Sequence, residues 1–257
     1  MTTAPITVLE WTYEPKGFFE ESCNLPFSDG EIAIAAGVAR GEFGAERYDE
    51  GQCFRDSAQE FLDSAFLAQQ VQVHQHFTLS KAVAAREHAD GRRDCTVFLK
   101  PVALTMSLGQ IDVIVQDEHG NVTTDTKAER LQRQVGFHSK IMHLIPLHSE
   151  IKRMLQSFRN ALNDPDNFLI HLFEIRETVV CYVQKPPVQH QQVNVSASDW
   201  SKFGRLANDE PLLEGRHRGK RSELRKATSE EVRWALCFGQ CLIEGYVQLL
   251  DDNEKIK

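Results

Sequence analysis

The chain has 257 residues, of which 41% are hydrophobic and 26% are charged, and it contains only 15 Gly and 9 Pro. This composition is typical of a globular protein and excludes a disordered, collagen-like or low-complexity chain. The formal net charge of −8 argues against general coating of nucleic acid, so any anionic partner is expected to bind at a local basic segment.

The sequence predicts a soluble, cytoplasmic protein without a membrane segment. Its first thirty residues contain Glu10, Glu14, Glu20 and Glu21 where a secretory signal would have a basic start and an apolar run. No window approaches ~18 uninterrupted apolar residues, the length that a spanning helix requires. The six cysteines, at positions 23, 53, 95, 181, 237 and 241, include no CxxC pair, and we expect reduced and mostly buried thiols.

Residues 1–122 are predicted to form a β-rich domain, a small antiparallel sheet with one helix. Strands are expected at residues 5–13, 31–36, 71–79, 95–99 and 111–115. Residues 54–69 change to a helical period and are predicted to form one amphipathic helix on the sheet. The turn signal at residues 89–93 predicts a hairpin.

Residues 123–257 are predicted to form an all-helical bundle, so the chain as a whole is expected to be an α+β protein. Helices are expected at residues 123–145, 151–162, 164–185, 198–208 and 228–249. The first is expected to bury Ala128, Leu131, Val135, His138, Met142 and Ile145. The last begins with Thr228-Ser-Glu-Glu231, which is a capping-box pattern.

The strongest local feature is a basic loop between the last two helices. The stretch 202–226 holds eight Lys or Arg residues against four Asp or Glu residues. Candidate binding residues are Arg205, Asn208, Arg216, His217, Arg218, Lys220 and Arg221. Guanidinium and ammonium groups bind phosphate, and the two glycines of the loop let the backbone approach a ligand. We therefore expect contact with RNA or a nucleotide at residues 205–221.

A catalytic interpretation assigns three of these residues to RNA cleavage. His217, among several guanidinium groups, is expected to lose basicity by charge repulsion and to act as a neutral base on a ribose 2′-hydroxyl. Arg205 and Arg216 would then stabilise the charge of the phosphorane. The alternative is structural, because the arginines can bridge to the acidic helix starts at 209–210 and 230–231 and so pin the loop.

The C-terminal half resembles a bacterial protein family with HEPN-like helical domains, of the type found in defence and toxin systems. The segments that carry the resemblance begin at Leu169 (LIHLFEIRE), Asp199 (DWSKFGRLANDE), Gly215 (GRHRGK) and Leu224 (LRKAT). The resemblance implies a helical bundle and, for catalytic members, a ribonuclease site at a dimer interface that needs no metal.

The basic loop departs from the catalytic HEPN pattern, in which an Arg with a polar neighbour precedes a His by four to six intervening positions. Eleven residues separate Arg205 from His217, and Arg216 is directly adjacent to His217. A pair that matches by count is Arg133-Gln134 before His138, with four intervening residues. Since His138 lies on the predicted core stripe, this pair is kept as an alternative.

The remaining His and Cys pairs favour a structural role. His74 and His76 share one face of the predicted strand 71–79, but a zinc site needs further ligands, and none has a fixed spacing here. Cys237 and Cys241 lie about one helical turn apart among apolar neighbours and are predicted to be small buried thiols. No Walker, GxGxxG, GxSxG, HExxH or EF-hand pattern occurs in the chain, so no cofactor or metal is predicted.

These observations favour a non-enzymatic interaction or regulatory protein of a bacterial cytoplasmic system of the defence type. The β-rich domain is expected to recognise a protein partner, and the bundle is expected to self-associate as a homodimer. One alternative is a metal-independent HEPN-type endoribonuclease that uses the catalytic residues above. Another is a sensor of a nucleotide or small anion, bound at the loop before the last helix, near its positive dipole end.

Overall fold

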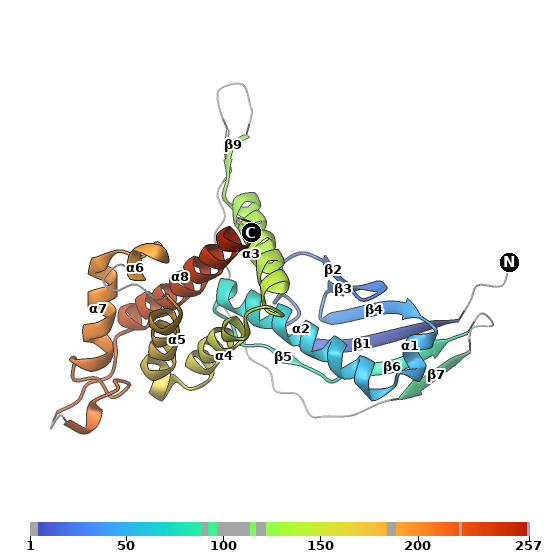
Figure 1. Ribbon diagram of the computed structural model, residues 1–257, viewed down its shortest axis with the longest axis horizontal. Coiled ribbons are helices and arrows are strands. Elements are labelled where there is room, and N and C mark those ends of the chain that lie inside the picture. Colours follow the sequence, from blue (N-terminus) through green and yellow to red (C-terminus); the bar gives the residue numbers. More distant parts are fainter. Residues whose placement is uncertain are drawn as a thin grey trace. The chain divides into compact units, whose positions relative to one another are not determined.

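The computed structural model describes residues 5–88, 92–96, 114–116, 122–183, 189–220 and 223–255. A β-sheet dominates the N-terminal part and helices dominate the C-terminal part, which confirms the α+β class (Figure 1). Residue contacts divide the chain into two compact units. Unit 1 comprises Met1–Gln69 and Gln75–Gly109, and unit 2 comprises Gln70–His74 and Gln110–Lys257.

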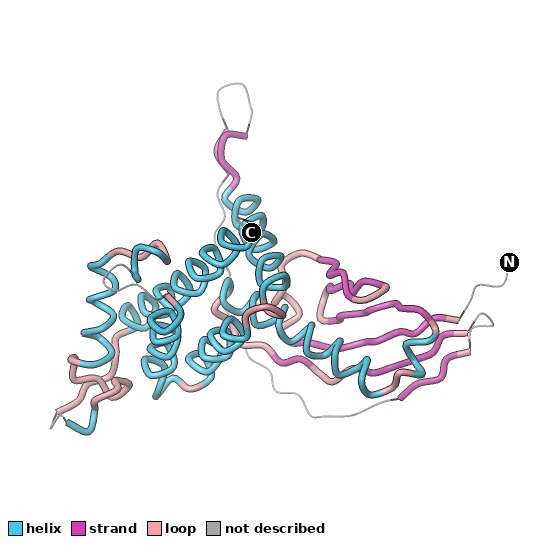
Figure 2. The backbone as a smooth tube through the Cα atoms, viewed as in Figure 1, coloured by secondary structure: helices cyan, strands magenta, loops and turns pink. Residues whose placement is uncertain are grey.

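Unit 1 is built on an antiparallel sheet (Figure 2). Its strands are β1 (Ile6–Glu14), β2 (Cys23–Phe27), β3 (Gly30–Ala35), β4 (Val38–Gly44), β5 (Thr78–Leu79), β6 (Val83–Glu87) and β7 (Arg93–Thr96). They lie in the order β2-β3-β4-β1-β6-β7, and the short β5 pairs with the end of β1. β1 is central because it pairs with β4 on one side and with β6 on the other. β6, which the sequence pattern does not predict, pairs with β7, in agreement with a hairpin, whereas residues 89–91 of the predicted turn lie outside the described residues.

The helix α2 (Gln52–Val73) covers one face of this sheet and closes the core of unit 1 (Figure 1). Trp11 of β1 is buried, and its indole Nε1 donates a hydrogen bond to Gln59 Oε1 of α2 over 3.0 Å. Tyr13 packs edge to face on Phe66 of α2, with ring centroids 5.1 Å apart. The amphipathic helix predicted over residues 54–69 is therefore confirmed. A single turn, α1 (Glu46–Asp49), precedes it.

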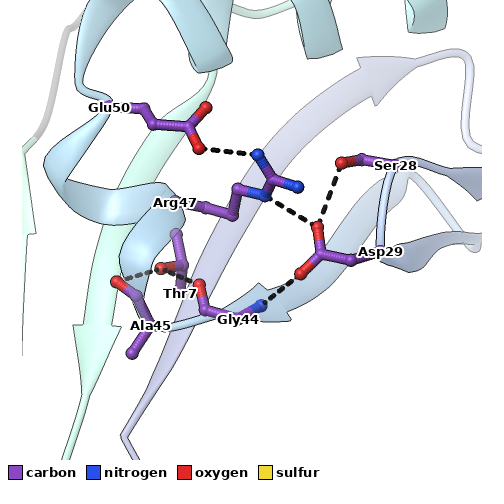
Figure 3. A network of polar contacts seen from close by, with 7 residues as sticks. All are labelled: Thr7, Ser28, Asp29, Gly44, Ala45, Arg47 and Glu50. Atoms are coloured by element: carbon purple, nitrogen blue, oxygen red, sulfur yellow. Dashed lines mark hydrogen bonds and ion pairs between the residues drawn. The ribbon is translucent and has the colours of Figure 1, made fainter.

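A polar network fixes the connection between β4 and α1 (Figure 3). Asp29, in the turn between β2 and β3, accepts hydrogen bonds from the Gly44 backbone N–H at 3.0 Å and from Arg47 Nε at 2.8 Å. Arg47 also pairs with Glu50 over 2.6 Å. The Gly44 N–H and the Arg47 guanidinium lower the pKa of Asp29 to about 2. These charges satisfy one another, so we assign the network a structural role.

The strand predicted at residues 71–79 is wrong. Residues 71–73 form the last turn of α2, and only the two residues of β5 are extended strand. The helix ends at His74, whose φ of 50° is the left-handed conformation that closes many helices. The apolar residues at 71 and 73 fit an alternating pattern, but Val71 continues the buried stripe of α2. His74 and His76 therefore do not share a strand face.

The sequence pattern predicts neither β2 nor β4. Proline is depleted from strands, and β2 tolerates Pro26 because it is the edge strand of the sheet. Glycine is also depleted from strands, and β4 contains Gly41. The strand needs glycine there because an added Cβ would lie 2.5 Å from the ring of Phe43. Two parts of the predicted strands, residues 97–99 and 111–113, lie outside the described residues.

Unit 2 is a helical bundle preceded by a hairpin of β8 (Ile114–Gln116) and β9 (Val122–Asp125). Its helices are α3 (Thr126–Leu144), α4 (Ser149–Asn163), α5 (Phe168–Tyr182), α6 (Gln189–Gln192), α7 (Ala197–Asn208) and α8 (Ser229–Glu254), with 3-10 turns η1 (Pro165–Asn167) and η2 (Arg218–Lys220). α8 is the central element, in contact with each of the helices α3 to α7 (Figure 1). None of the described helices combines the length and the hydrophobicity of a membrane span.

The start and the buried face of α8 are fixed by polar contacts. The predicted capping box is confirmed, because Thr228 Oγ1 accepts from the Glu231 N–H at 3.2 Å and the Glu231 carboxylate accepts from the Thr228 N–H at 2.8 Å. Further along α8, the Tyr246 hydroxyl donates to the buried Glu150 carboxylate of α4 over 2.9 Å. Burial, and then this carboxylate, raise the pKa of Tyr246. The buried pair ties α8 to α4.

The face predicted to be buried on α3 is wrong except at His138, which is buried as predicted. The helix buries Gln134, Phe137, His138, Ile141 and Leu144. Val135, placed on the predicted stripe, is 66% exposed. Apolar residues occur on two sides of this helix, and contact with α8 decides which side is buried.

The prediction of mostly buried thiols is also wrong. Cys23, Cys53, Cys181, Cys237 and Cys241 are free, and all of these except Cys23 are exposed. Successive residues of a helix are about 100° apart, so the apolar neighbours of a cysteine can face the core while the cysteine does not. On α8, Phe238 and Leu242 are buried and the cysteines next to them are not.

Candidate functional site

The basic loop runs from the end of α7 to the start of α8, and backbone hydrogen bonds hold it. Leu213 donates to the carbonyl of Arg225, and Arg225 donates to the carbonyl of Pro211, each over 2.9 Å. The Arg216 N–H donates to the carbonyl of Ala207, in the last turn of α7, over 2.8 Å. The backbone is thus anchored where the Arg216 side chain leaves it.

Arg216 lies over the ring of Phe173, a residue of α5. Its guanidinium carbon is 3.9 Å from the ring centroid, which is cation–π geometry. The guanidinium also donates to Asn208 Oδ1 over 3.5 Å and pairs with Glu177 over 3.4 Å. The structure therefore brings together two of the residues predicted for this site, Arg216 and Asn208.

A second guanidinium, that of Arg176 on α5, lies against the same ring. It is 5.2 Å from the Phe173 centroid and 4.6 Å from the ring centroid of Trp200 on α7. Its Nε is buried and has no hydrogen-bond partner among the described residues. Burial lowers the pKa of Arg176, and the positive charge of Arg216 lowers it further. The two arginines therefore repel each other across a shared aromatic surface.

We call Phe173, Arg176, Trp200 and Arg216 the Arg–aromatic cluster. α7 approaches α5 closely at Gly204, where an added Cβ would lie 3.1 Å from Arg176 Nη1. The sequence interpretation missed Arg176. The available signal was spacing, because Phe173 and Arg176 are three residues apart and so share one face of a helix. That this face meets Arg216 follows only from the tertiary structure.

Arg218, predicted to bind an anion, holds the loop to η1 in the structure. Its guanidinium donates to the carbonyls of Asp166 at 3.2 Å and Leu213 at 2.9 Å, and to Asn167 Oδ1 at 2.8 Å. Because these partners are neutral, they hold the side chain in place without cancelling its charge.

The structure shows no contact between the remaining predicted residues and the Arg–aromatic cluster among the residues that it describes. Arg205 and His217 are exposed, and no described residue pairs with either side chain. The side chain of Lys220 and all of Arg221 lie outside the described residues. In the alternative catalytic pair, Arg133 is exposed to solvent, whereas His138 is only 8% exposed and lies in the core.

Neutralisation by the chain's own carboxylates occurs at Arg225. This side chain bonds to both carboxylate oxygens of Glu231 over 2.7 Å and lies 3.7 Å from Glu210. The pair with Arg225 lowers the pKa of Glu231 to about 2. Since Glu231 also caps α8, the positive end of this helix already carries a carboxylate of the chain itself. In the Arg–aromatic cluster, by contrast, the one ion pair within the described chain is the 3.4 Å contact between Arg216 and Glu177.

Aromatic rings continue from the cluster along α7 and α8. Phe203 stacks on Phe173 at 6.1 Å and on Phe238 at 4.6 Å between centroids. Trp234 stacks on Phe238 at 5.6 Å, and Lys202 Nζ lies 4.0 Å from the Trp234 centroid. Phe203 and Phe238 are buried, so the rings that a ligand can reach beside cations are the partly exposed Trp200 and Trp234.

No metal site accompanies this cluster in the described ranges, where no group of three or more His, Cys, Asp or Glu residues is placed to hold an ion. His74, considered as a ligand from the sequence, lies with Nε2 2.8 Å from Gln240 Oε1. Comparisons with protein-family models, with curated proteins and with solved structures find no match for this chain. The function is therefore inferred from the site itself.

Proposed function

We propose that unit 2 binds single-stranded RNA at the Arg–aromatic cluster, and that the protein acts as a non-enzymatic interaction or regulatory protein. The observation that carries this proposal is the pair of guanidinium groups, Arg176 and Arg216, on the single ring of Phe173. Like charges held this close disfavour each other, and the exposed Glu177 offsets only part of the charge. A phosphate that accepts from both arginines removes the repulsion and gains charge-assisted hydrogen bonds.

Single-stranded RNA fits the chemistry around these arginines. It presents phosphates together with unstacked bases, and such bases stack on aromatic rings and on guanidinium planes. Trp200 and Trp234 are partly exposed beside Arg176 and Lys202, so the same surface offers both kinds of contact. The net charge of −8 disfavours general contact with nucleic acid, so binding is expected where cations are gathered locally.

Fluorescence anisotropy with a labelled single-stranded RNA tests the proposal. Arg176→Gln and Arg216→Gln are each expected to weaken binding about tenfold, which corresponds to about 1.4 kcal/mol. Arg55→Gln, in unit 1, changes the net charge equally and is expected to leave the affinity unchanged. Equal weakening by all three substitutions, or preference for an acidic peptide over RNA, would overturn the proposal.

A second candidate, endoribonuclease activity of the HEPN type, is favoured by the exposure of His217 directly beside Arg216. An exposed imidazole can reach a ribose 2′-hydroxyl of RNA held by the neighbouring guanidinium. Incubation of RNA with the protein in EDTA tests this role. Cleavage that His217→Ala abolishes while binding is retained supports it, whereas intact RNA after incubation with the unmodified protein refutes it.

A further inference from the structure

We propose that a pocket between α3 and α8 binds a nucleoside monophosphate. The pocket has a volume of about 500 Å³, within the range of roughly 300–1,000 Å³ for small-ligand sites. α3 and α8 form its walls, and Gln72 from the end of α2 contributes within the same unit. The residues of the Arg–aromatic cluster do not line it, so this is a separate site within unit 2.

One wall of the pocket carries cations suited to a phosphate. Arg130, Arg133 and Lys140 lie on one face of α3, since positions separated by three or seven residues share a side of a helix. Arg133 is exposed, and no described residue pairs with its guanidinium. Glu244 is the single carboxylate of the lining, and Lys140 also pairs with Asp251 beside the pocket over 3.7 Å, so the arginines supply the remaining positive charge of this wall. A phosphate is the anion that such a set of guanidinium and ammonium groups binds well.

The side chain of Gln134, which is unpaired among the described residues, lines the same pocket. Gln134 lines the pocket and is 9% exposed, and no described residue forms a hydrogen bond to its side chain. The other glutamines of the lining are paired. Gln72 and Gln240 donate to Glu244 over 2.9 and 2.8 Å, and Gln248 donates to an aspartate one turn further along α8 over 2.7 Å. The amide of Gln134 therefore presents a donor and an acceptor at the pocket that no described residue uses, and a ligand can bind to both.

The position of this amide relative to the cations suggests a nucleobase. A glutamine side chain presents a donor beside an acceptor, which matches the edge of a base. Phe137, three residues from Gln134 on α3, lines the same pocket and offers an apolar ring for the base to pack against. Arg130 precedes Gln134 by four residues, a rise of about 6 Å, so one helix carries phosphate and base contacts at the spacing of one nucleotide.

The side of the pocket opposite α3 is held in place before any ligand arrives. His74 Nε2 lies 2.8 Å from Gln240 Oε1, and the Gln240 amide in turn donates to Glu244. His74 also packs against Phe158, with ring centroids 5.3 Å apart. Burial lowers the pKa of His74, which favours the uncharged imidazole.

Isothermal titration calorimetry with AMP, GMP, CMP and UMP, and separately with inorganic phosphate, tests the proposal. At least one nucleotide is expected to bind with one-to-one stoichiometry under conditions where inorganic phosphate gives no measurable heat. Gln134→Met and the exposed Arg133→Gln are each expected to weaken that binding at least fivefold, with unchanged far-UV circular dichroism. Arg216→Gln is expected to bind the nucleotide as the unmodified protein does, even if it loses RNA.

Three results would overturn this inference. They are no heat with any of the four nucleotides at millimolar concentration, inorganic phosphate binding as tightly as the nucleotides, and unchanged affinity in Gln134→Met. Because RNA binding is assigned to other residues, failure at this pocket leaves the proposal for the Arg–aromatic cluster intact, and the reverse also holds.

Discussion

Replacing Gln134 by Met is expected to stabilise unit 2 by about 1 kcal/mol. Gln134 as a whole residue is 9% exposed, and no described residue forms a hydrogen bond to its amide. A buried polar group without a partner costs about 1–3 kcal/mol, and the lower end applies because the side chain borders a pocket and keeps some contact with solvent. Methionine has a similar length and helix propensity, so the substitution removes the polar group without opening a cavity.

Urea unfolding followed by far-UV circular dichroism measures this change, and Gln69→Met is its matched control. Gln69 is also on a helix and 5% exposed, but its Nε2 donates to the Phe18 carbonyl over 3.2 Å. Removing that donor leaves a buried carbonyl unpaired, so this substitution is expected to destabilise the protein by about 1 kcal/mol. The same Gln→Met replacement should thus raise the free energy of unfolding at position 134 and lower it at position 69. If Gln134→Met lowered the free energy of unfolding as much as Gln69→Met, Gln134 would be hydrogen-bonded in the native protein and the reasoning would fail.

Three further predictions concern stability. The pKa of Asp29 is lowered from 3.8 to about 2, first by a backbone N–H and then by an arginine. The ionised Asp29 carboxylate therefore contributes about 1 kcal/mol to the free energy of unfolding after solvent screening. This contribution is complete above pH 4 and is lost as the pH falls toward 2, so Asp29→Asn should flatten this part of an acid-unfolding curve. Tyr246→Phe leaves the buried Glu150 carboxylate without its hydroxyl donor and should lower the free energy of unfolding by about 2 kcal/mol, measured from the urea midpoint. Gly245→Ala places a Cβ 2.0 Å from the Val193 carbonyl oxygen and should cost about 1–3 kcal/mol, seen as a lower melting temperature; an unchanged melting temperature would show that the two segments are not in contact.

Local signals in the sequence were sufficient for much of the fold. The capping box at Thr228 sets the start of α8, and the change of hydrophobic period locates α2. Prediction failed where tertiary contacts decide between two patterns. Val71 fits both an alternating strand and a helical stripe, and Val135 lies on one of two apolar sides of α3, of which only the other meets α8.

The candidate site was predicted only in part, for the same physical reason. A basic loop is visible as composition, and Arg216 was identified in this way. The sequence does not show that Arg225 bonds to the start of α8 while Arg216 crosses to Phe173 on α5. Arg176 was missed because it is a single arginine in an apolar helix, and it becomes part of a site only when α5 meets the loop.

The salt dependence of RNA binding tests most directly whether Arg176 and Arg216 bind phosphate together. For single-stranded nucleic acid, each phosphate contact contributes about −0.7 to the slope of log K against log salt concentration. Because the two arginines are proposed to bind one phosphate, the double substitution Arg176→Gln with Arg216→Gln is expected to make the slope shallower by about 0.7, while Arg55→Gln leaves it as it is. A slope that is the same in the double variant and in the unmodified protein would contradict the account.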